Sequence, residues 1–122
     1  MSAHILTVDD SASIRMTTKI ALTGAGYQIT EAVDGQDGLG KAKSANFDLI
    51  ITDLNMPNMN GLEMIEALRQ SPAHTGIPII FLTTESDADM KTRAKAAGAT
   101  GWVTKPFDPE NLVKIVRKVL GR

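Results

Sequence analysis

The sequence alternates between short apolar runs, rich in β-branched residues, and longer polar segments of helical length. Runs of this length and composition are typical of β-strands. Five such runs predict strands at residues 5–8, 27–33, 47–51, 77–82 and 98–103, of which the second is the weakest. Strands that alternate with helices are the pattern of a parallel sheet covered by helices on both faces. Few other folds are compatible with this order.

Five segments of helical length lie between and after these runs. The last is the most clearly marked, because Asp108 is suited to cap its N-terminus, Pro109 fits its first turn and Gly121 fits its end. The predicted helix in the second of these segments is the weakest, because Gly38 and Gly40 each cost about 1 kcal/mol relative to alanine inside a helix. This second helix lies near residues 36–44, and the remaining ones run from residue 11 or 13 to 24, near 62–70 and near 86–97.

The length of the chain predicts a single domain. At 122 residues, with no internal repeat or linker, it has the size of one compact unit with its own core. We therefore expect one α/β domain over residues 1–122, with five parallel strands and five helices. The nearly continuous apolar runs at 49–51 and 79–82 are expected to be its buried central strands. Ligands of such sheets bind beyond the carboxyl ends of the strands.

Composition excludes several classes of protein. The chain has no cysteine, which rules out disulfide scaffolds, thiolate zinc sites and cysteine nucleophiles. No apolar stretch approaches the roughly 18 to 20 residues that span a bilayer, and the N-terminus lacks a secretory signal pattern, so we expect a cytoplasmic protein without a membrane partner. Residues 91–122 carry 8 basic and 2 acidic side chains, which we interpret as a solvated helix surface rather than a nucleic-acid site.

Chemically reactive side chains follow four of the predicted strands. Asp9 and Asp10 come after the first, Asp53 after the third, Thr83 after the fourth and Lys105 after the fifth. Parallel strands place these positions on one rim, where like charges about 4 Å apart repel by about 4 kcal/mol at an effective dielectric near 20. Lys105 supplies one compensating charge, and oxygen ligands with room for water favour Mg²⁺ for the rest. A carboxylate in this setting is suited to accept a phosphoryl group.

Four separated segments carry a further pattern. They are Val8-Asp9-Asp10, Asp53-Leu54-Asn55-Met56-Pro57 followed by Gly61, Leu82-Thr83, and Lys105-Pro106-Phe107. In their order and spacing they resemble the signature of the CheY-like receiver domain of two-component response regulators, and the resemblance covers essentially the whole chain. It implies a flavodoxin-like, doubly wound sheet with the strand order 2-1-3-4-5.

The resemblance also implies the chemistry of the site. Asp53 would accept a phosphoryl group from a phosphohistidine of a partner histidine kinase. Asp10 and Asp53 would ligate Mg²⁺ through their side chains, Asn55 through its backbone carbonyl, and Asp9 mainly through water. Asn55 and Glu85 occupy the positions at which the family tunes hydrolysis of its own aspartyl phosphate. The chain would thus catalyse only its own phosphorylation and dephosphorylation, and would not be an enzyme acting on other substrates.

A second set of residues is implied to transmit the signal. Lys105 would pair with a phosphoryl oxygen, and its peptide bond to Pro106 would be cis. Thr83 would move toward the phosphoryl group and free space for Trp102, where the family more often has tyrosine or phenylalanine. The weakly amphipathic helix predicted at 86–97 is expected to be loosely held. Basic side chains expected near Trp102 suit an acidic peptide or helix as partner; they are Lys91, Lys95, Lys114 and Lys118.

Other functions are weaker interpretations of the same residues. A phosphatase of the haloacid-dehalogenase type needs an aspartate two residues after its nucleophile, and this chain has Asn55 there. A flavodoxin-like redox carrier would place its cofactor phosphate against Asp9 and Asp10, which would repel it. A DNA-binding regulator needs a further module, and none follows residue 122, so we expect no direct contact with nucleic acid.

Within the receiver family, the expected role is that of a monomeric chemotaxis regulator. Its phosphorylated form would bind a downstream protein such as a flagellar switch protein. The main alternative is a phosphorelay intermediate that passes the phosphoryl group to a histidine phosphotransfer protein. The sequence does not separate these two roles.

Overall fold

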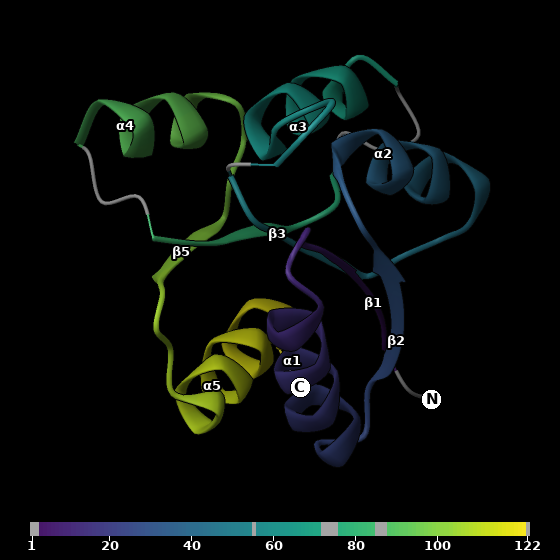
Figure 1. The fold of residues 1–122 in the computed structure, drawn as a ribbon, viewed down its shortest axis with the longest axis vertical. Coiled ribbons are helices and arrows are strands. Elements are labelled where there is room, and N and C mark those ends of the chain that lie inside the picture. Colours follow the sequence, from purple (N-terminus) through teal and green to yellow (C-terminus); the bar gives the residue numbers. More distant parts are fainter. Residues whose placement is uncertain (1–2, 55, 72–75, 85–87, 122) are drawn as a thin grey trace.

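The computed structural model describes residues 3–54, 56–71, 76–84 and 88–121, in which strands and helices alternate along the chain (Figure 1). The strands are β1 His4–Val8, β2 Gln28–Ala32, β3 Leu49–Thr52, β4 Ile79–Thr83 and β5 Gly101–Thr104. The helices are α1 Ala12–Gly24, α2 Gly35–Ser44, α3 Gly61–Arg69, α4 Ala88–Ala96 and α5 Pro109–Leu120. Each predicted strand and helix is therefore present, although most bounds differ by a few residues.

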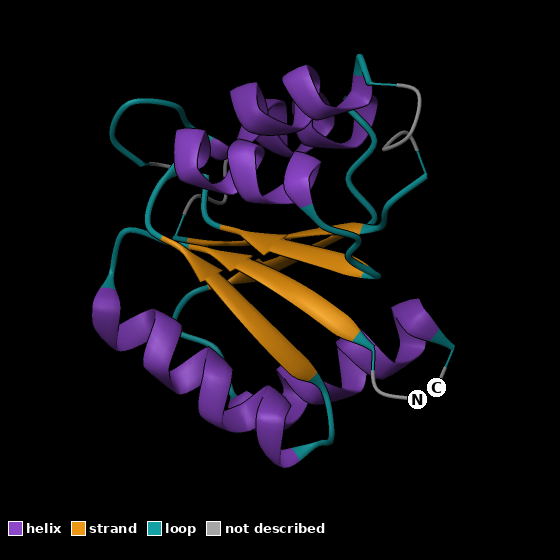
Figure 2. Cartoon of the chain, turned by 90° about the vertical axis from the view of Figure 1, so that its right-hand side faces the viewer, coloured by secondary structure: helices purple, strands orange, loops and turns teal. Residues whose placement is uncertain are grey.

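All five strands are parallel and lie in the order β2-β1-β3-β4-β5. Helices α1 and α5 cover one face of the sheet, and α2, α3 and α4 cover the other (Figures 1 and 2). The winding reverses between β1 and β3, since β2 lies on one side of β1 and the later strands lie on the other. The predicted α/β, flavodoxin-like fold with strand order 2-1-3-4-5 is confirmed.

The core is divided into two layers by the sheet. Alternate side chains of each strand enter opposite layers; Leu6, Ile50 and Phe81 pack under α2, α3 and α4, whereas Ile5 and Ile80 pack against α1 and α5. Every residue of β3 and β4 is buried, as predicted for the two central strands. This burial on both faces explains their nearly continuous apolar sequence.

Helix ends follow the expected capping chemistry. The Asp108 side chain accepts a hydrogen bond from the first turn of α5, Pro109 is its first residue, and Gly121 ends it at φ 75°. Ser11 caps α1 by accepting from the backbone N–H of Ile14. None of the helices in the described part of the chain has the length and hydropathy of a membrane span.

Helix α2 forms despite its glycines because two of them allow close packing. A Cβ on Gly38 would lie 2.8 Å from the Met64 sulfur and 2.9 Å from a Val8 methyl group. A Cβ on Gly35 would lie 2.1 Å from the carbonyl oxygen of Met59, which accepts a hydrogen bond from the Gly35 N–H. Gly38 thus lets the helix approach the sheet and Gly35 lets it approach the loop after β3, whereas a Cβ on Gly40 would meet no atom within 4 Å.

Candidate functional site

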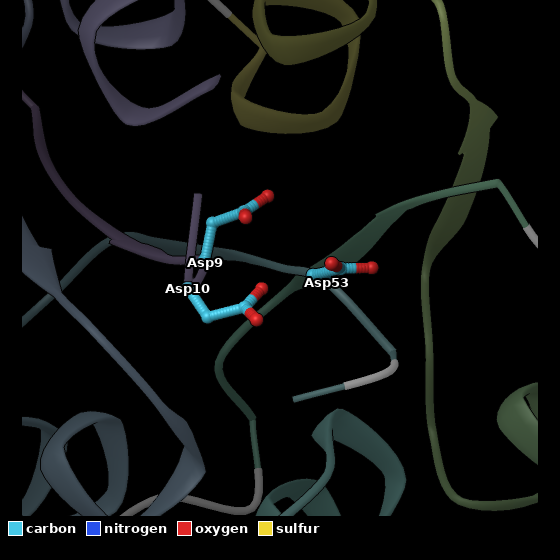
Figure 3. Close-up of side chains that lie close together, drawn as sticks. All are labelled: Asp9, Asp10 and Asp53. Carbon is cyan, nitrogen blue, oxygen red and sulfur yellow. The ribbon is translucent and has the colours of Figure 1, made fainter. Parts of the chain in front are cut away.

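Three aspartates gather at the carboxyl ends of β1 and β3 (Figure 3). One carboxylate oxygen from each of Asp9, Asp10 and Asp53 lies within 4.8 Å of the others. Asp9 and Asp53 are buried, whereas Asp10 is exposed to solvent. The predicted convergence of these three side chains is therefore present in the structure.

The strand register brings Asp9 and Asp53 together. Val8 of β1 pairs with Thr52 of β3, so the next residue of each strand emerges at the same level of the sheet. The Asp53 N–H donates to the Val8 carbonyl at 2.9 Å, which holds the two strand ends side by side. Two buried carboxylates thus lie at adjacent positions of the same rim.

Lys105 is the counter-charge of this cluster. Its Nζ donates to Asp9 Oδ2 at 2.8 Å and to Asp53 Oδ2 at 3.2 Å, and its side chain is only 11% exposed. The Lys105 N–H donates to the carbonyl of Thr83 at 2.7 Å, which fixes the loop after β5 to the end of β4. The peptide bond between Lys105 and Pro106 is cis, as the family resemblance implied.

Burial and pairing act in opposite directions on these charges. Burial raises the pKa of Asp9, and this outweighs the hydrogen bonds that its carboxylate accepts from Lys105 and from the Ser11 N–H. Burial alone would lower the pKa of Lys105, but the hydrogen bonds and negative charges of Asp9 and Asp53 together raise it. Lys105 therefore stays charged, whereas the desolvation of the Asp9 carboxylate is not fully offset by its hydrogen bonds.

The donor set of the cluster fits a small hard cation. Carboxylate oxygens are the ligands that Mg²⁺ prefers, and an exposed member such as Asp10 leaves room for bound water. Asp53 Oδ1 also accepts a hydrogen bond from the Leu54 N–H at 2.7 Å, which orients this carboxylate. Asn55 and Glu85, expected as a backbone ligand and as hydrolysis-tuning residues, lie outside the described residues.

The two predicted switch residues lie on the neighbouring strands. Thr83 is fully buried at the end of β4. Trp102 of β5 pairs with Phe81 in the register, and the centroids of their rings are 5.5 Å apart. Lys91 Nζ of α4 lies 5.7 Å from the centroid of the Trp102 ring, a cation–π geometry.

The predicted basic surface around Trp102 is only partly confirmed. Lys91 and Lys95 line a groove of about 320 Å³ with Trp102, between α4 and β5. Lys114 instead lines a separate groove beside Gly24, at the end of α1. The prediction is wrong there because α5 packs on the opposite face of the sheet from α4.

Arg15 is a site residue that the sequence reasoning missed. Its Nη1 donates to the backbone carbonyl of Asp9 at 2.6 Å, and its Nε lies 3.5 Å from a carboxylate oxygen of Glu31. Arg15 thus ties the first turn of α1 to the strand end that carries Asp9. In the sequence, only the position of Arg15 one turn into the helix that follows Asp9 and Asp10 pointed to this contact, and such a position predicts it weakly.

Comparisons with known proteins agree with this geometry. The family model of the response regulator receiver domain matches residues 5–117. Response regulator ArlR of Staphylococcus aureus is 40% identical over 119 residues, which are 98% of this chain and 53% of ArlR. The chain thus spans about half the length of the curated relatives it matches.

Two solved structures show the same likeness. Chemotaxis protein CheY4 of Vibrio cholerae is 46% identical, with a TM-score of 0.93 over 98% of this chain and 99% of that chain. A response regulator of Burkholderia multivorans is also 46% identical, with a TM-score of 0.81 over 98% and 95% of the two chains. Membership in one family decides against the haloacid-dehalogenase and flavodoxin alternatives. The chain belongs to the response regulator receiver domain family of two-component signalling.

Proposed function

We propose that Asp53 accepts a phosphoryl group from a phosphohistidine of a partner histidine kinase, and that Asp9, Asp10 and Asp53 hold Mg²⁺ during this reaction. The observation that carries the proposal is the shared contact of Lys105 with Asp9 and Asp53 inside a cluster of three carboxylates. Receiver domains take phosphoryl groups from histidine kinases, and this chain belongs to that family.

The side chains have distinct parts in the transfer. An oxygen of the Asp53 carboxylate attacks phosphorus, the bond between phosphorus and the imidazole nitrogen breaks, and the freed nitrogen takes a proton from solvent. The Leu54 N–H holds Asp53 in place by donating to Oδ1 at 2.7 Å. Lys105 places an ammonium where negative charge gathers on the transferred oxygens. Mg²⁺, when bound, supplies further positive charge at the same oxygens.

We further propose that the phosphorylated chain binds a downstream protein through the groove between α4 and β5, in chemotaxis. Lys91, Lys95 and Trp102 line this groove, and they give it positive charge and an aromatic wall, which suit an acidic helix or peptide. Similarity to chemotaxis protein CheY4 over nearly the full length of both chains supports the chemotaxis role. The chain then catalyses no reaction other than its own phosphorylation and dephosphorylation.

The phosphoacceptor is tested with acetyl phosphate or a phosphorylated histidine kinase as donor. Incorporation into the unmodified protein with Mg²⁺ is expected to be abolished by Asp53→Asn and by excess chelator. Asp48→Asn serves as the control, because Asp48 is exposed and lies outside the cluster. Undiminished labelling of Asp53→Asn would show that another residue is the acceptor.

The role is tested by binding. Phosphorylated and unmodified protein are compared for retention on a flagellar switch protein and on a histidine phosphotransfer protein. Phosphorylation-dependent retention on the switch protein, weakened by Lys91→Ala, supports the chemotaxis proposal. Transfer of label to the phosphotransfer protein, without retention on the switch protein, would establish the phosphorelay role instead.

A further inference from the structure

Two buried hydroxyl groups below the aspartate cluster have no hydrogen-bond partner among the described residues. They are Oγ1 of Thr7 on β1 and Oγ1 of Thr18 on α1. Thr7 is 3% exposed and Thr18 is 1% exposed, so bulk water does not reach them. Buried side-chain hydroxyls are nearly always hydrogen-bonded, to protein or to ordered water. The two orphaned groups therefore require an explanation.

Other threonines of α1 show that Thr18 differs from its neighbours. The hydroxyls of Thr17 and Thr23 each donate to the backbone carbonyl four residues earlier, at 3.0 and 2.6 Å. This is the usual local partner of a helical threonine. The Thr18 hydroxyl makes no such bond, although it lies on the same helix.

A small cavity adjoins both threonines. Its volume is about 10 Å³, and it is lined by Thr7 and Thr18 together with residues of the site above, Asp9, Arg15 and Asp53. A cavity of about this size accommodates one water molecule, which needs two to four polar partners. The cavity has room for one water molecule, and the two threonine hydroxyls supply the minimum number of polar partners that such a water needs.

The charges around the cavity favour a neutral occupant. The lining carries both signs of charge, and each charged group already has a partner: Arg15 is paired with Glu31, and Asp9 and Asp53 are paired with Lys105. The remaining walls include the apolar side chains of Ile51 and Leu82. An ion in a cavity of this size would lose its hydration and would have to compete with these existing pairs, whereas a water molecule loses little.

We propose that one structural water molecule binds in this cavity and bridges the hydroxyls of Thr7 and Thr18. The bridge joins the second turn of α1 to β1, two residues before Asp9. Arg15 joins the first turn of α1 to the Asp9 carbonyl, so α1 is attached to the strand that carries the acidic pair at two successive levels.

Valine substitutions distinguish a hydrated cavity from a dry one, because valine replaces the hydroxyl by a methyl group of similar size. If the water is bound, Thr7→Val or Thr18→Val alone removes one of its partners and strands the other hydroxyl. Each single variant then has a melting temperature lowered by roughly 3 °C or more. The double variant removes both hydroxyls and loses clearly less than the sum of the single losses.

In a dry cavity each substitution would remove an unsatisfied polar group, and both single variants would melt at or above the temperature of the unmodified protein. That result would overturn the proposal, as would losses that are fully additive. Thr17→Val on the exposed side of α1 controls for the helix propensity of valine, and it should change the melting temperature little.

A crystal structure of the unmodified chain at about 1.5 Å or better tests the site directly. We expect a water oxygen at about 2.7 to 3.2 Å from both hydroxyl oxygens. An empty cavity, or a Thr18 hydroxyl turned to the carbonyl of residue 14, would refute the proposal even if the valine variants did not fold.

Discussion

Removing the ammonium from the aspartate cluster should destabilise the protein strongly. Lys105→Met keeps the length of the side chain but leaves Asp9 and Asp53 without the charge that now lies 2.8 and 3.2 Å from their oxygens. Unit charges at these distances attract by about 6 and 5 kcal/mol at an effective dielectric of 20, and desolvation offsets much of this. Breaking a buried pair costs about 3–5 kcal/mol. Because the cluster opens to solvent at Asp10, we expect a loss of about 3 kcal/mol.

Urea unfolding at pH 7.5 with chelator present measures this loss. The matched control is Lys19→Met, because Lys19 is 54% exposed and its Nζ lies 3.8 Å from Glu31. Such an exposed pair contributes at most about 1 kcal/mol. Adding Asp9→Asn to Lys105→Met should recover part of the loss, since it removes a buried charge, and Mg²⁺ should recover part of it as well.

Two outcomes would refute this reasoning. Lys105→Met could lose no more stability than Lys19→Met, which would mean that repulsion among the carboxylates is negligible. Alternatively, Asp9→Asn could give no recovery in the Lys105→Met background, which would assign the loss to packing of the lysine stem rather than to charge.

Two other predictions concern α2 and the loop that contacts its N-terminus. The Gly38→Ala variant should be less stable than the Gly40→Ala variant by about 2 kcal/mol in denaturant unfolding. A Cβ at position 38 would meet side chains of α3 and β1 within 3.0 Å, whereas a Cβ at position 40 would meet no atom within 4 Å. Equal stability of the two variants would contradict the close packing at Gly38. Hydrogen bonds donated by the Asp37 N–H and by the Asn58 side chain lower the pKa of Asp34 below its ordinary value of 3.8. The Asp34 carboxylate therefore stabilises the fold above pH 3.8, and this contribution is lost as the pH falls through the pKa of the folded state. Asn58→Gly, which retains the positive φ of 69°, should raise this pKa in an NMR titration, and an unchanged pKa would exclude the contact.

The strand and helix order could be predicted from the sequence because it depends on local patterns. Apolar runs, a capping aspartate and a terminal glycine specify elements within a few residues of themselves. Element bounds were less accurate; β4 begins at Ile79 rather than at residue 77, and β5 begins at Gly101 rather than at residue 98. The pairing partners of these strands decide where the ladder begins, and an apolar run carries no information about them.

Tertiary contacts were the part that the sequence could not supply. Gly38 counted against a helix by propensity, yet the approach of Met64 and Val8 requires a glycine there. The hydrogen bond from Arg15 to the Asp9 carbonyl depends on the direction in which α1 continues after the end of β1. Whether the hydroxyls of Thr7 and Thr18 find a partner depends on which side chains surround them in the folded protein. The aspartate cluster was predictable because parallel strand ends share one rim whatever the details of packing.

The formal charges of the site support the proposed transfer of a phosphoryl group to Asp53. Asp9, Asp10 and Asp53 with Lys105 sum to −2 when all are ionised. A bound divalent cation brings this sum to zero, so an incoming anionic phosphoryl group meets no net repulsion. Lys105 alone would leave the approach unfavourable, and the metal alone would leave Asp53 without the ammonium that lies 3.2 Å from its oxygen. In the proposed reaction both charges would be needed, because two carboxylates are buried side by side at one edge of the sheet.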